Sequence, residues 1–414
     1  MVLESHQNRL EGESITFYVL LVLFVLLFGF NTFSHLREPI GDEAVHAFQI
    51  NRFLNGNFEF FNNLTMLPGY HALNALISKV FGYSGFNTLR FSSFLLSVLS
   101  LPVLYKIIAL YHTEEARIRL LQFLMIPFVF PLFFLIYTDM TSLFFVLSTF
   151  YLSLKKQHKL AALTAIFALL IRQTNIIWIA YFCALNIFNH RGFEVSKAYV
   201  VGVIKEYWPY LCVACLFLLY VFLNGGVAAG DKEQHPISFN ISNMYFMLFV
   251  CFCVFSPICI ANTKNIIRLL KSNIILWVFL VVGFFVYMYT YEHPHKYNTK
   301  ELSFYRHNLF IYYTSDILWM RILNYFLMTW FCLTYWVSIV QGKFKNELML
   351  LIPFTLLSVV PLPLIEHRYY LMFICLFMVF RPPVAKAYDI ITLLLFGIFS
   401  AYIAFNVSRM TFFL

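Results

Sequence analysis

Long apolar runs separated by short polar segments make up most of the chain. Runs near or above the length of a membrane span lie at 15–33, 90–111, 119–137, 140–154, 207–223, 243–261, 274–291 and 385–405. Three longer apolar segments, at 160–189, 309–340 and 347–380, are interrupted by polar residues. The pattern predicts an all-α polytopic membrane protein with about 11–13 transmembrane helices.

The segment 160–189 is predicted to be two short helices. It lies between the basic clusters 155–159 and 191–205, and Lys and Arg concentrate on the cytosolic side of membrane proteins. One span cannot place both clusters on that side, so we expect a break at "RQTN" (172–175), with Arg172 and Gln173 at or near the luminal face. An unpaired Arg in mid-membrane would cost at least a few kcal/mol. The segment around Arg321 raises the same question, which the sequence leaves open.

The remaining basic clusters set the topology. Placing Arg117/Arg119, Lys264/Arg268/Lys271 and Lys343/Lys345 in the cytosol, together with the N-terminus, puts four loops on the opposite side: 34–89, 224–242, 292–308 and 366–368. The first apolar run has no basic leader and no small-residue cleavage site, so we interpret it as a retained span. We therefore interpret 1–414 as a single multi-span membrane domain, with 34–89 as its first luminal loop.

Composition agrees with a membrane protein and narrows its partners. Of the 414 residues, 61% are hydrophobic and 12% are charged, which is too apolar for a soluble domain of this length. The net charge of +9 fits cytosolic loops, and no basic tail or phosphate-binding loop suggests a nucleic-acid partner. All eight cysteines lie in apolar runs, where small buried residues are the better interpretation than metal ligands or disulfides.

The stretch "GDEAVHAFQINRF" (41–53) is unusually polar for this chain. If it is helical, Asp42, His46 and Gln49 share one face, whereas Glu43 faces sideways. Acidic residues at a helix start also occur simply because the helix dipole favours them there. A carboxylate at the boundary between membrane and water can, however, act as a general base.

The other luminal loops carry mostly cations. They contribute Asp231, Lys232 and His235; His293, His295, Lys296, Arg306 and His307; and Glu366, His367 and Arg368. Each loop alone reads as an ordinary solvated segment. Together, an acid on one loop and cations on others suit a reaction with an anionic leaving group. The sequence has no HExxH motif and "HPH" lacks helical spacing, so we expect no metal site.

Four stretches resemble the eukaryotic dolichyl-phosphate-glucose α-1,2-glucosyltransferases. They are "GDEAVHAFQINRF…LPGYHAL" (41–73), "YTDMTSLFF" with "IRQTNIIW" (137–145 and 171–178), "NGGVAAGDKEQH" (224–235), and "YRHNLFIYY" with "EHRYY" (305–313 and 366–370). They occur in the family's order along nearly the whole chain. Two departures concern acceptor contacts: "EFFNNLTMLPG" lacks the usual acid before Pro-Gly, and the family's Asp-Asn-Arg-His run is reduced to Arg306-His307.

The resemblance implies a GT-C glycosyltransferase of the endoplasmic reticulum membrane with a luminal active site. The donor would be dolichyl-phosphate β-glucose, and the acceptor a diglucosylated dolichyl-diphosphate oligosaccharide used for N-glycosylation. A β donor and an α product require inversion, hence one in-line displacement and one base. We assign that base to Asp42, with Glu43 in reserve. Cations can stabilise a monophosphate leaving group without a metal or other cofactor.

The resemblance also assigns the remaining candidate residues. His46 would orient Asp42 or bind sugar, and the cations that could hold the phosphate are Arg172, Lys232, His235, Arg306 and Arg368. Further substrate contacts are expected from Gln49, Gln173, Asp231 and His307, and a groove between spans would hold the dolichol. Two alternatives stay open: a mannosyltransferase of the same fold, and a transporter or non-catalytic membrane subunit. Acids and cations placed in loops beside the membrane, rather than along spans, favour group transfer.

Overall fold

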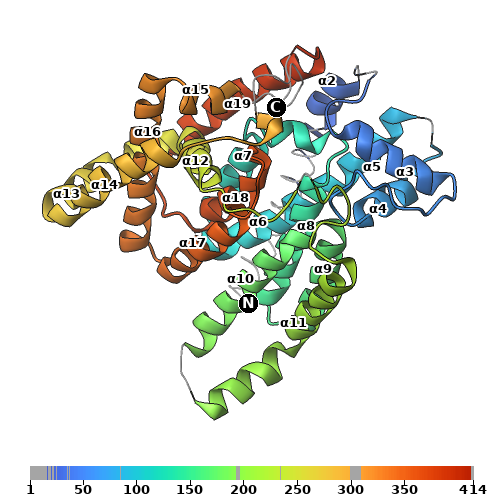
Figure 1. Ribbon diagram of the computed structural model, residues 1–414, viewed down its shortest axis with the longest axis horizontal. Coiled ribbons are helices and arrows are strands. Elements are labelled where there is room, and N and C mark those ends of the chain that lie inside the picture. Colours follow the sequence, from blue (N-terminus) through green and yellow to red (C-terminus); the bar gives the residue numbers. More distant parts are fainter. Residues whose placement is uncertain are drawn as a thin grey trace.

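The computed structural model describes residues 16, 20, 23–24, 26–34, 36, 38–83, 85–192, 196–233, 235–298 and 309–411. All regular elements in these ranges are helices (Figure 1). The predicted all-α membrane class is therefore confirmed. Most of the first predicted span, as well as Arg306 and His307, lies outside the described residues.

The first half of the chain forms two helices in the first predicted luminal loop and then a group of packed helices. The helices of the loop are α3 (Glu43–Leu54) and α4 (Gly69–Val80). A π-helical turn (Leu26–Phe30) and α2 (Asn31–Ser34) precede them. The packed helices are α5 (Phe86–Val98), α6 (Ser100–Tyr111), α7 (Ala116–Leu124), α8 (Asp139–Leu154), α9 (His158–Ile171), α10 (Ile176–Arg191) and α11 (Lys197–Asn224).

The second half packs around one buried helix, α18 (Leu371–Phe380), in which every residue is buried. It lies near the centre of the molecule, next to α6, α7 and α17 (Figure 1). The other helices of this half are α12 (Ser242–Ala261), α13 (Thr263–Ser272), α14 (Ile274–Thr290), α15 (Leu309–Ser315), α16 (Leu318–Gln341), α17 (Lys345–Val359) and α19 (Lys386–Ser408). Four 3-10 turns lie between the helices of the two halves. They are Phe130–Phe133 and Gln173–Asn175 in the first half, and Lys296–Asn298 and His367–Tyr370 in the second.

Among the described residues, five helical segments are long and apolar enough to cross a membrane. They are Phe86–Tyr111, Lys197–Asn224, Ser242–Ala261, Leu318–Gln341 and Lys386–Ser408. The bent pair of α13 and α14 would make a sixth. Other apolar helices, such as α8 and α9, have only 16 and 14 residues. The expected count of 11–13 spans remains a prediction, because these shorter helices fall below ordinary spanning length.

The predicted break in 160–189 is confirmed. Helix α9 ends at Ile171 and α10 begins at Ile176, with the 3-10 turn between them. The open question around Arg321 also has an answer. Its guanidinium donates to the carbonyls of Met288 at 2.7 Å and Tyr291 at 3.0 Å, so it satisfies the free carbonyls at the end of α14.

The apolar run 119–137 is not one helix. Helix α7 ends at Leu124, and the chain continues through turns that are buried in the core. Pro127 and Pro131 explain the difference, since proline lacks the backbone N–H and clashes with the preceding turn of a helix. The chain then enters α8, whose first residue, Asp139, lies at the edge of a cavity.

Candidate active site

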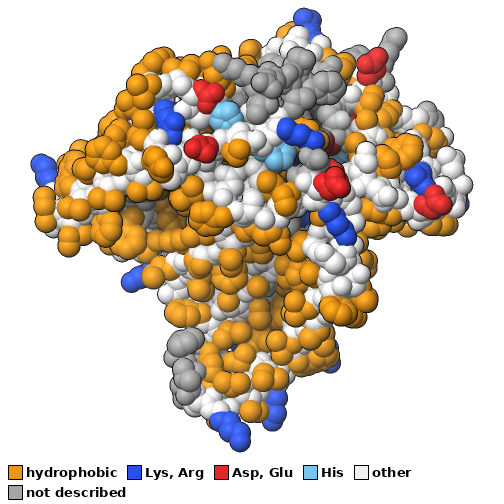
Figure 2. All heavy atoms as spheres, viewed as in Figure 1, with side chains coloured by type: hydrophobic (Ala, Val, Ile, Leu, Met, Phe, Trp, Pro, Cys, Tyr) orange, Lys and Arg blue, Asp and Glu red, His pale blue; other side chains and the backbone are white. Residues whose placement is uncertain are grey.

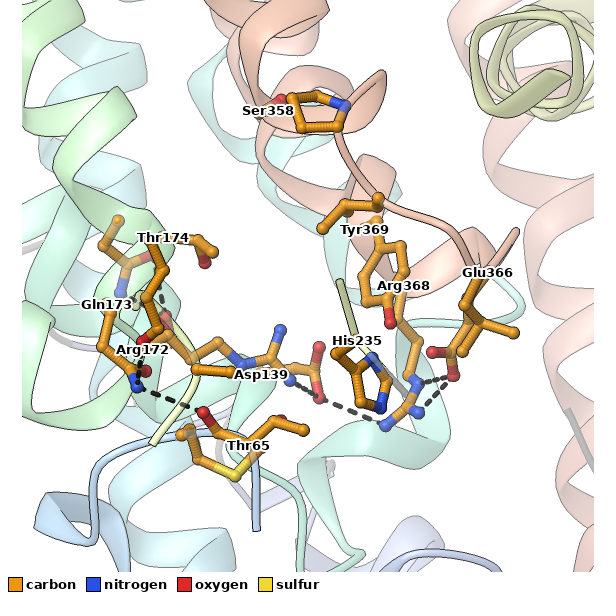
Figure 3. A pocket seen from close by; sticks show the side chains of 18 of the residues that line it. Thr65, Asp139, Arg172, Gln173, Thr174, His235, Ser358, Glu366, Arg368 and Tyr369 are labelled. Carbon is orange, nitrogen blue, oxygen red and sulfur yellow. Dashed lines mark hydrogen bonds and ion pairs between the residues drawn. The ribbon is translucent and has the colours of Figure 1, made fainter. Parts of the chain in front are cut away.

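A cavity of about 440 Å³ opens between two groups of helices. One wall comes from the starts of α3, α8 and α10, the turn after α9, and α11, and the other from α17 and the start of α18. Residues 63–66, 227–228, 231 and 235–237 form its rim. Three of the four loops predicted to share one side of the membrane therefore meet here. Figure 3 shows polar side chains from both walls pointing towards each other across the cavity.

Five charged side chains form what we call the cavity network: Asp42, Asp139, Arg172, Glu366 and Arg368. Arg368 Nη2 lies 2.9 Å from Asp42 Oδ2, and Arg368 Nη1 lies 3.7 Å from Asp139 Oδ2. Asp139 Oδ2 is also 2.9 Å from Arg172 Nη2, and Glu366 forms an ion pair with Arg368. Asp139 thus lies between the two guanidinium groups (Figure 3).

The ends of helices position this network. Asp42 directly precedes α3, and its backbone N–H donates to Tyr137 Oη at 3.2 Å. The Arg368 guanidinium stacks over the Tyr137 ring at 4.7 Å. Asp139 is the first residue of α8, where the helix dipole favours a carboxylate. Arg172 directly follows α9, and its Nε donates to Thr138 Oγ1 at 2.8 Å.

His46 lines the cavity as a neutral imidazole. Its Nδ1 lies 3.0 Å from Nε2 of His71, which is itself fully buried. Burial, together with the positive charges of Arg368 and Arg172, lowers the pKa of His46 to about 3. Burial and the neighbouring His46 also hold the pKa of His71 well below its usual value. The Nδ1 atom of His46 is therefore taken by the neighbouring histidine.

Arg368 is permanently charged in this setting. Burial alone would lower the pKa of its guanidinium, but the carboxylates of Glu366 and Asp139 outweigh burial and raise it. Arg368 therefore provides a permanent positive charge that orients the surrounding carboxylates through charge-assisted hydrogen bonds.

Gln173 links the two loops of the rim. Its Nε2 donates to the carbonyls of Thr65 and Val227, both at 3.1 Å, and its Oε1 accepts from the backbone N–H of Leu67. The same loops also bond directly, since Asp231 N–H donates to Asn62 O at 2.7 Å. A Cβ at Gly230 would lie 2.3 Å from that carbonyl, so only glycine permits this approach.

Seven of the twelve predicted site residues line the cavity: Asp42, His46, Arg172, Gln173, Asp231, His235 and Arg368. His235 Nε2 lies 3.7 Å from Asp231 Oδ2, and burial lowers the pKa of His235. Three others, Glu43, Gln49 and Lys232, are not among the lining residues. The last two, Arg306 and His307, lie outside the described part of the chain.

Glu43 is buried in a separate ion pair. Both of its oxygens face Arg90, with Oε1 at 3.0 Å from Nε and Oε2 at 2.7 Å from Nη2. The same oxygens accept the backbone N–H groups of Ile136 and Ile40. A carboxylate with four donors and no exposed surface has no lone pair within reach of a substrate.

Gln49 and Lys232 bond to the backbone away from the cavity. Gln49 donates to Glu59 O at 3.2 Å and accepts from Phe61 N–H at 2.8 Å, which fixes the loop after α3. Lys232 Nζ donates to Asn224 O at the end of α11. The two side chains therefore stabilise loops around the cavity and do not line it.

Asp139 and Tyr137 contribute to the site but were not predicted as site residues from the sequence. The signal was present, because "YTDM" places an acid between two apolar runs and belongs to one of the four family-like stretches. What the sequence could not show is that this acid pairs with Arg172 and Arg368, which come from distant segments. Among the described residues, no group of three His, Cys, Asp or Glu side chains is arranged to hold a metal ion.

The cavity lining combines charged side chains with apolar ones. The apolar side chains, which we call the apolar wall, come from α10, α11, α17 and α18 and include Ile176, Trp178, Phe217, Leu357 and Met372. An amphipathic ligand fits this division, with an anionic head at the arginines and a hydrocarbon tail between the helices. The network also offers carboxylates that could accept a proton next to that head.

Comparison with known proteins points in the same direction. The model of the DIE2/ALG10 family matches residues 36–198 and 191–381. A human relative named Dol-P-Glc:Glc(2)Man(9)GlcNAc(2)-PP-Dol alpha-1,2-glucosyltransferase is 27% identical, with 88% of each chain covered. Relatives of the same name from Rattus norvegicus (27% identical, 94% of this chain and 96% of the relative) and Candida albicans (26%, 85% and 86%) also match. No solved structure matches the chain.

Proposed function

The chain belongs to the DIE2/ALG10 family, and from this membership we propose that it transfers glucose from dolichyl-phosphate glucose, in α-1,2 linkage, to a diglucosylated dolichyl-diphosphate oligosaccharide. The observation that best supports this function is the cavity itself. It joins a carboxylate and two arginines to an apolar wall, which is what a lipid phosphate donor and a sugar hydroxyl acceptor require.

The reaction we propose is a single displacement with inversion. The acceptor 2-hydroxyl oxygen bonds to the glucose C1 as the bond from C1 to the phosphate oxygen breaks. The hydroxyl proton passes to a carboxylate, and dolichyl phosphate leaves as an anion. The site must therefore supply one accessible base and at least one cation next to the leaving phosphate.

Asp42 fits the role of the base better than its acidic neighbours. Its side chain is 19% exposed and lines the cavity, whereas the side chains of Asp139 and Glu43 are fully buried. Arg368 Nη2 binds one oxygen, Oδ2, and so fixes the orientation of the carboxylate. An acceptor hydroxyl in the cavity can therefore reach Asp42 without any rearrangement of the surrounding helices.

Arg172 fits the role of phosphate ligand. It is 21% exposed, and within the described residues its Nη1 has no hydrogen-bond partner, while Nε and Nη2 are held by Thr138 and Asp139. It also lies one turn before Ile176 and Trp178, which contribute to the apolar wall. A phosphate bound here would place its dolichol tail along that wall.

Asp139 and His46 have supporting roles in this scheme. The Asp139 carboxylate contacts the guanidinium groups of both Arg172 and Arg368. It thereby sets the distance between the arginine that binds the base and the arginine that would bind the phosphate. His46 is neutral at physiological pH because its pKa is about 3, so it can exchange hydrogen bonds with sugar hydroxyls but adds no charge. Glu43, in contrast, would serve the fold through Arg90.

The enzyme would work in the endoplasmic reticulum with the cavity towards the lumen. The distribution of basic clusters supports this orientation. A cysteine introduced at Phe58, which is 80% exposed and lies in the first predicted luminal loop, should resist a membrane-impermeant thiol reagent in sealed microsomes. It should react after the membrane is opened with detergent. Labelling in sealed vesicles would contradict the luminal orientation.

Glucose transfer by the purified protein tests the function directly. Reconstituted protein should move labelled glucose from dolichyl-phosphate glucose to the diglucosylated lipid acceptor, and an α-glucosidase should release the label. Neither dolichyl-phosphate mannose nor a nucleotide-linked glucose should replace the donor. Equal transfer of mannose would indicate a mannosyltransferase, and movement of the lipid across the bilayer without transfer would indicate a transporter.

A further inference from the structure

A short basic helix, α13, separates the two long apolar helices α12 and α14. Its ten residues, "TKNIIRLLKS", include no acid. At roughly 100° per residue, Lys264, Arg268 and Lys271 fall on one face, and the apolar side chains of Ile266 and Leu270 fall on the opposite face. This division is much sharper than in the neighbouring helices, which are apolar on all sides.

The three cations of α13 have no partner in the described part of the chain. Lys264, Arg268 and Lys271 are exposed, and no carboxylate of the described residues forms an ion pair with them. Four other arginines of the described residues differ, because each has a carboxylate within ion-pair distance: the buried Arg90, Arg119 and Arg381, and the half-buried Arg368. Among the described residues, the three cations of α13 are therefore open to an external anion.

Helix α13 lies at the end of α12 that is remote from the cavity. Helix α12 begins beside the cavity, where Asn243 Nδ2 donates to Leu362 O and Leu364 O. It runs for 20 residues with a kink at Phe255, just before Pro257, so its path to α13 is about 30 Å long at 1.5 Å per residue. Helix α14 then returns to the same region, where Glu292 N–H donates to Ser242 Oγ at 3.0 Å. Helix α13 is thus the far end of a hairpin.

The hairpin has a surface suited to lipid and a sharp bend. Helices α13 and α14 meet at 104°. Helix α14 exposes large apolar side chains such as Ile274, Phe279 and Phe285, at 79%, 69% and 66% exposure. The hairpin projects from the body of the molecule in Figure 1, and the surface there is mostly hydrophobic in Figure 2. If α14 crosses the bilayer, the bend turns α13 along the membrane surface.

We propose that α13 lies in the membrane interface opposite the cavity and that Lys264, Arg268 and Lys271 bind the headgroups of anionic phospholipids. Ile266, which is 6% exposed, packs against the protein, and Ile267, which is 47% exposed, faces the acyl chains. Basic side chains at a membrane surface attract anionic lipids. The site concerns membrane anchoring, so it stands whether or not the chain transfers glucose.

Chemical labelling of lysines can test this binding in the intact protein. The purified chain is placed in nanodiscs of phosphatidylcholine, with or without phosphatidylserine, and acetylation of each lysine is followed by mass spectrometry. We expect Lys264 and Lys271 to react about five-fold more slowly with phosphatidylserine present, and high salt to remove the difference. Lys232, an exposed lysine at the cavity rim, should react equally in both.

Variants and competing anions make the test specific. Arg268→Gln should reduce the protection of Lys264 and Lys271, whereas Lys79→Gln, which removes an exposed cation from α4, should leave it unchanged. Equal reaction rates in the two nanodiscs, or equal protection by soluble inorganic phosphate, would overturn the lipid site. Full protection in phosphatidylcholine alone would show that apolar burial, rather than anionic headgroups, shields the lysines.

Discussion

Two charge networks lie at opposite ends of one buried segment, and they differ in access. The 3-10 turn that leads into α18 carries Arg368, which belongs to the cavity network. The other end of α18 is followed by Arg381, whose guanidinium lies 2.5 Å from Asp389 and 3.1 Å from Gln122 Oε1. In both networks an arginine is held by carboxylates or amides from distant segments.

The network around Arg381 is closed. The side chains of Arg381 and Asp389 are 0% and 3% exposed, and Arg119 beside them donates to the carbonyls of Met378 and Arg381. These donors satisfy the free carbonyls at the end of α18. In the cavity network, Asp42 and Arg172 are 19% and 21% exposed instead. Both networks consist of paired charges, so charge pairing alone does not identify an active site. The difference is that solvent and substrate can reach the cavity network but cannot reach the network around Arg381.

We expect the largest effects from substituting Asp42 and Glu43, because one carboxylate is accessible from the cavity and the other is buried in a structural ion pair. Asp42→Asn keeps the shape but cannot accept a proton, so we expect turnover to fall by about 10²–10⁴ with normal protein abundance. Glu43→Gln leaves Arg90 buried without its counter-charge, so folded protein should be lost instead. Glucose transfer normalised to folded protein distinguishes the two. Near-normal transfer by Asp42→Asn would remove Asp42 as the base, and a larger loss per folded molecule in Glu43→Gln would move the role there.

A substitution in the closed network should affect stability alone. Asp389→Asn leaves the buried Arg381 without its carboxylate, which typically costs about 3–5 kcal/mol. Thermal unfolding in detergent should show a lower midpoint than the parent protein. Transfer per folded molecule should stay close to normal because the network is remote from the cavity. A selective loss of turnover with unchanged stability would break the distinction between the two networks.

Arg172→Lys should have an intermediate effect on donor use. Lysine keeps the charge but loses the planar fork that can hold a phosphate while still bonding Thr138 and Asp139. We expect KM for the lipid donor to rise about tenfold, in line with the strength of a charge-assisted hydrogen bond. Lys232→Gln is the matched control, since Lys232 bonds to Asn224 O outside the cavity. Unchanged donor affinity in an Arg172→Ala variant would make Arg172 structural.

Local chemistry made part of this molecule predictable from sequence. The break at 172–175 followed from basic residues on both sides and from the cost of burying Arg172. Helical spacing separated Glu43 from the face of Asp42 and His46, as the structure also has it. The same reasoning missed the turns after Leu124, although Pro127 was visible in the run.

The contacts of the cavity network were beyond such reasoning. Asp139 becomes a site residue only because folding brings Arg172 and Arg368 to either side of it. Helical spacing places Gln49 on the same face as Asp42 and His46. Its amide nevertheless donates to Glu59 O and accepts from Phe61 N–H, so both of its polar atoms bond to the loop after α3. Periodicity identifies a face of a helix, but the partner of that face depends on tertiary packing.

The smallest effect we expect is a dependence of stability on pH that arises from His46. Its pKa is about 3 in the folded protein, against about 6.5 when unfolded, because burial and the two arginines disfavour the charged form. Below about pH 6.5 the unfolded chain binds a proton that the folded protein does not, so stability is complete above that pH and falls as the pH drops towards the folded pKa. The loss is at most about 1.4 kcal/mol per pH unit for one such group. His46→Gln should make unfolding midpoints between neutral and mildly acidic pH less dependent on pH, while Asp42→Asn should retain the dependence. If the dependence is the same in His46→Gln and in the parent protein, His46 is not the group that titrates, and the neutral imidazole assigned to the cavity is wrong.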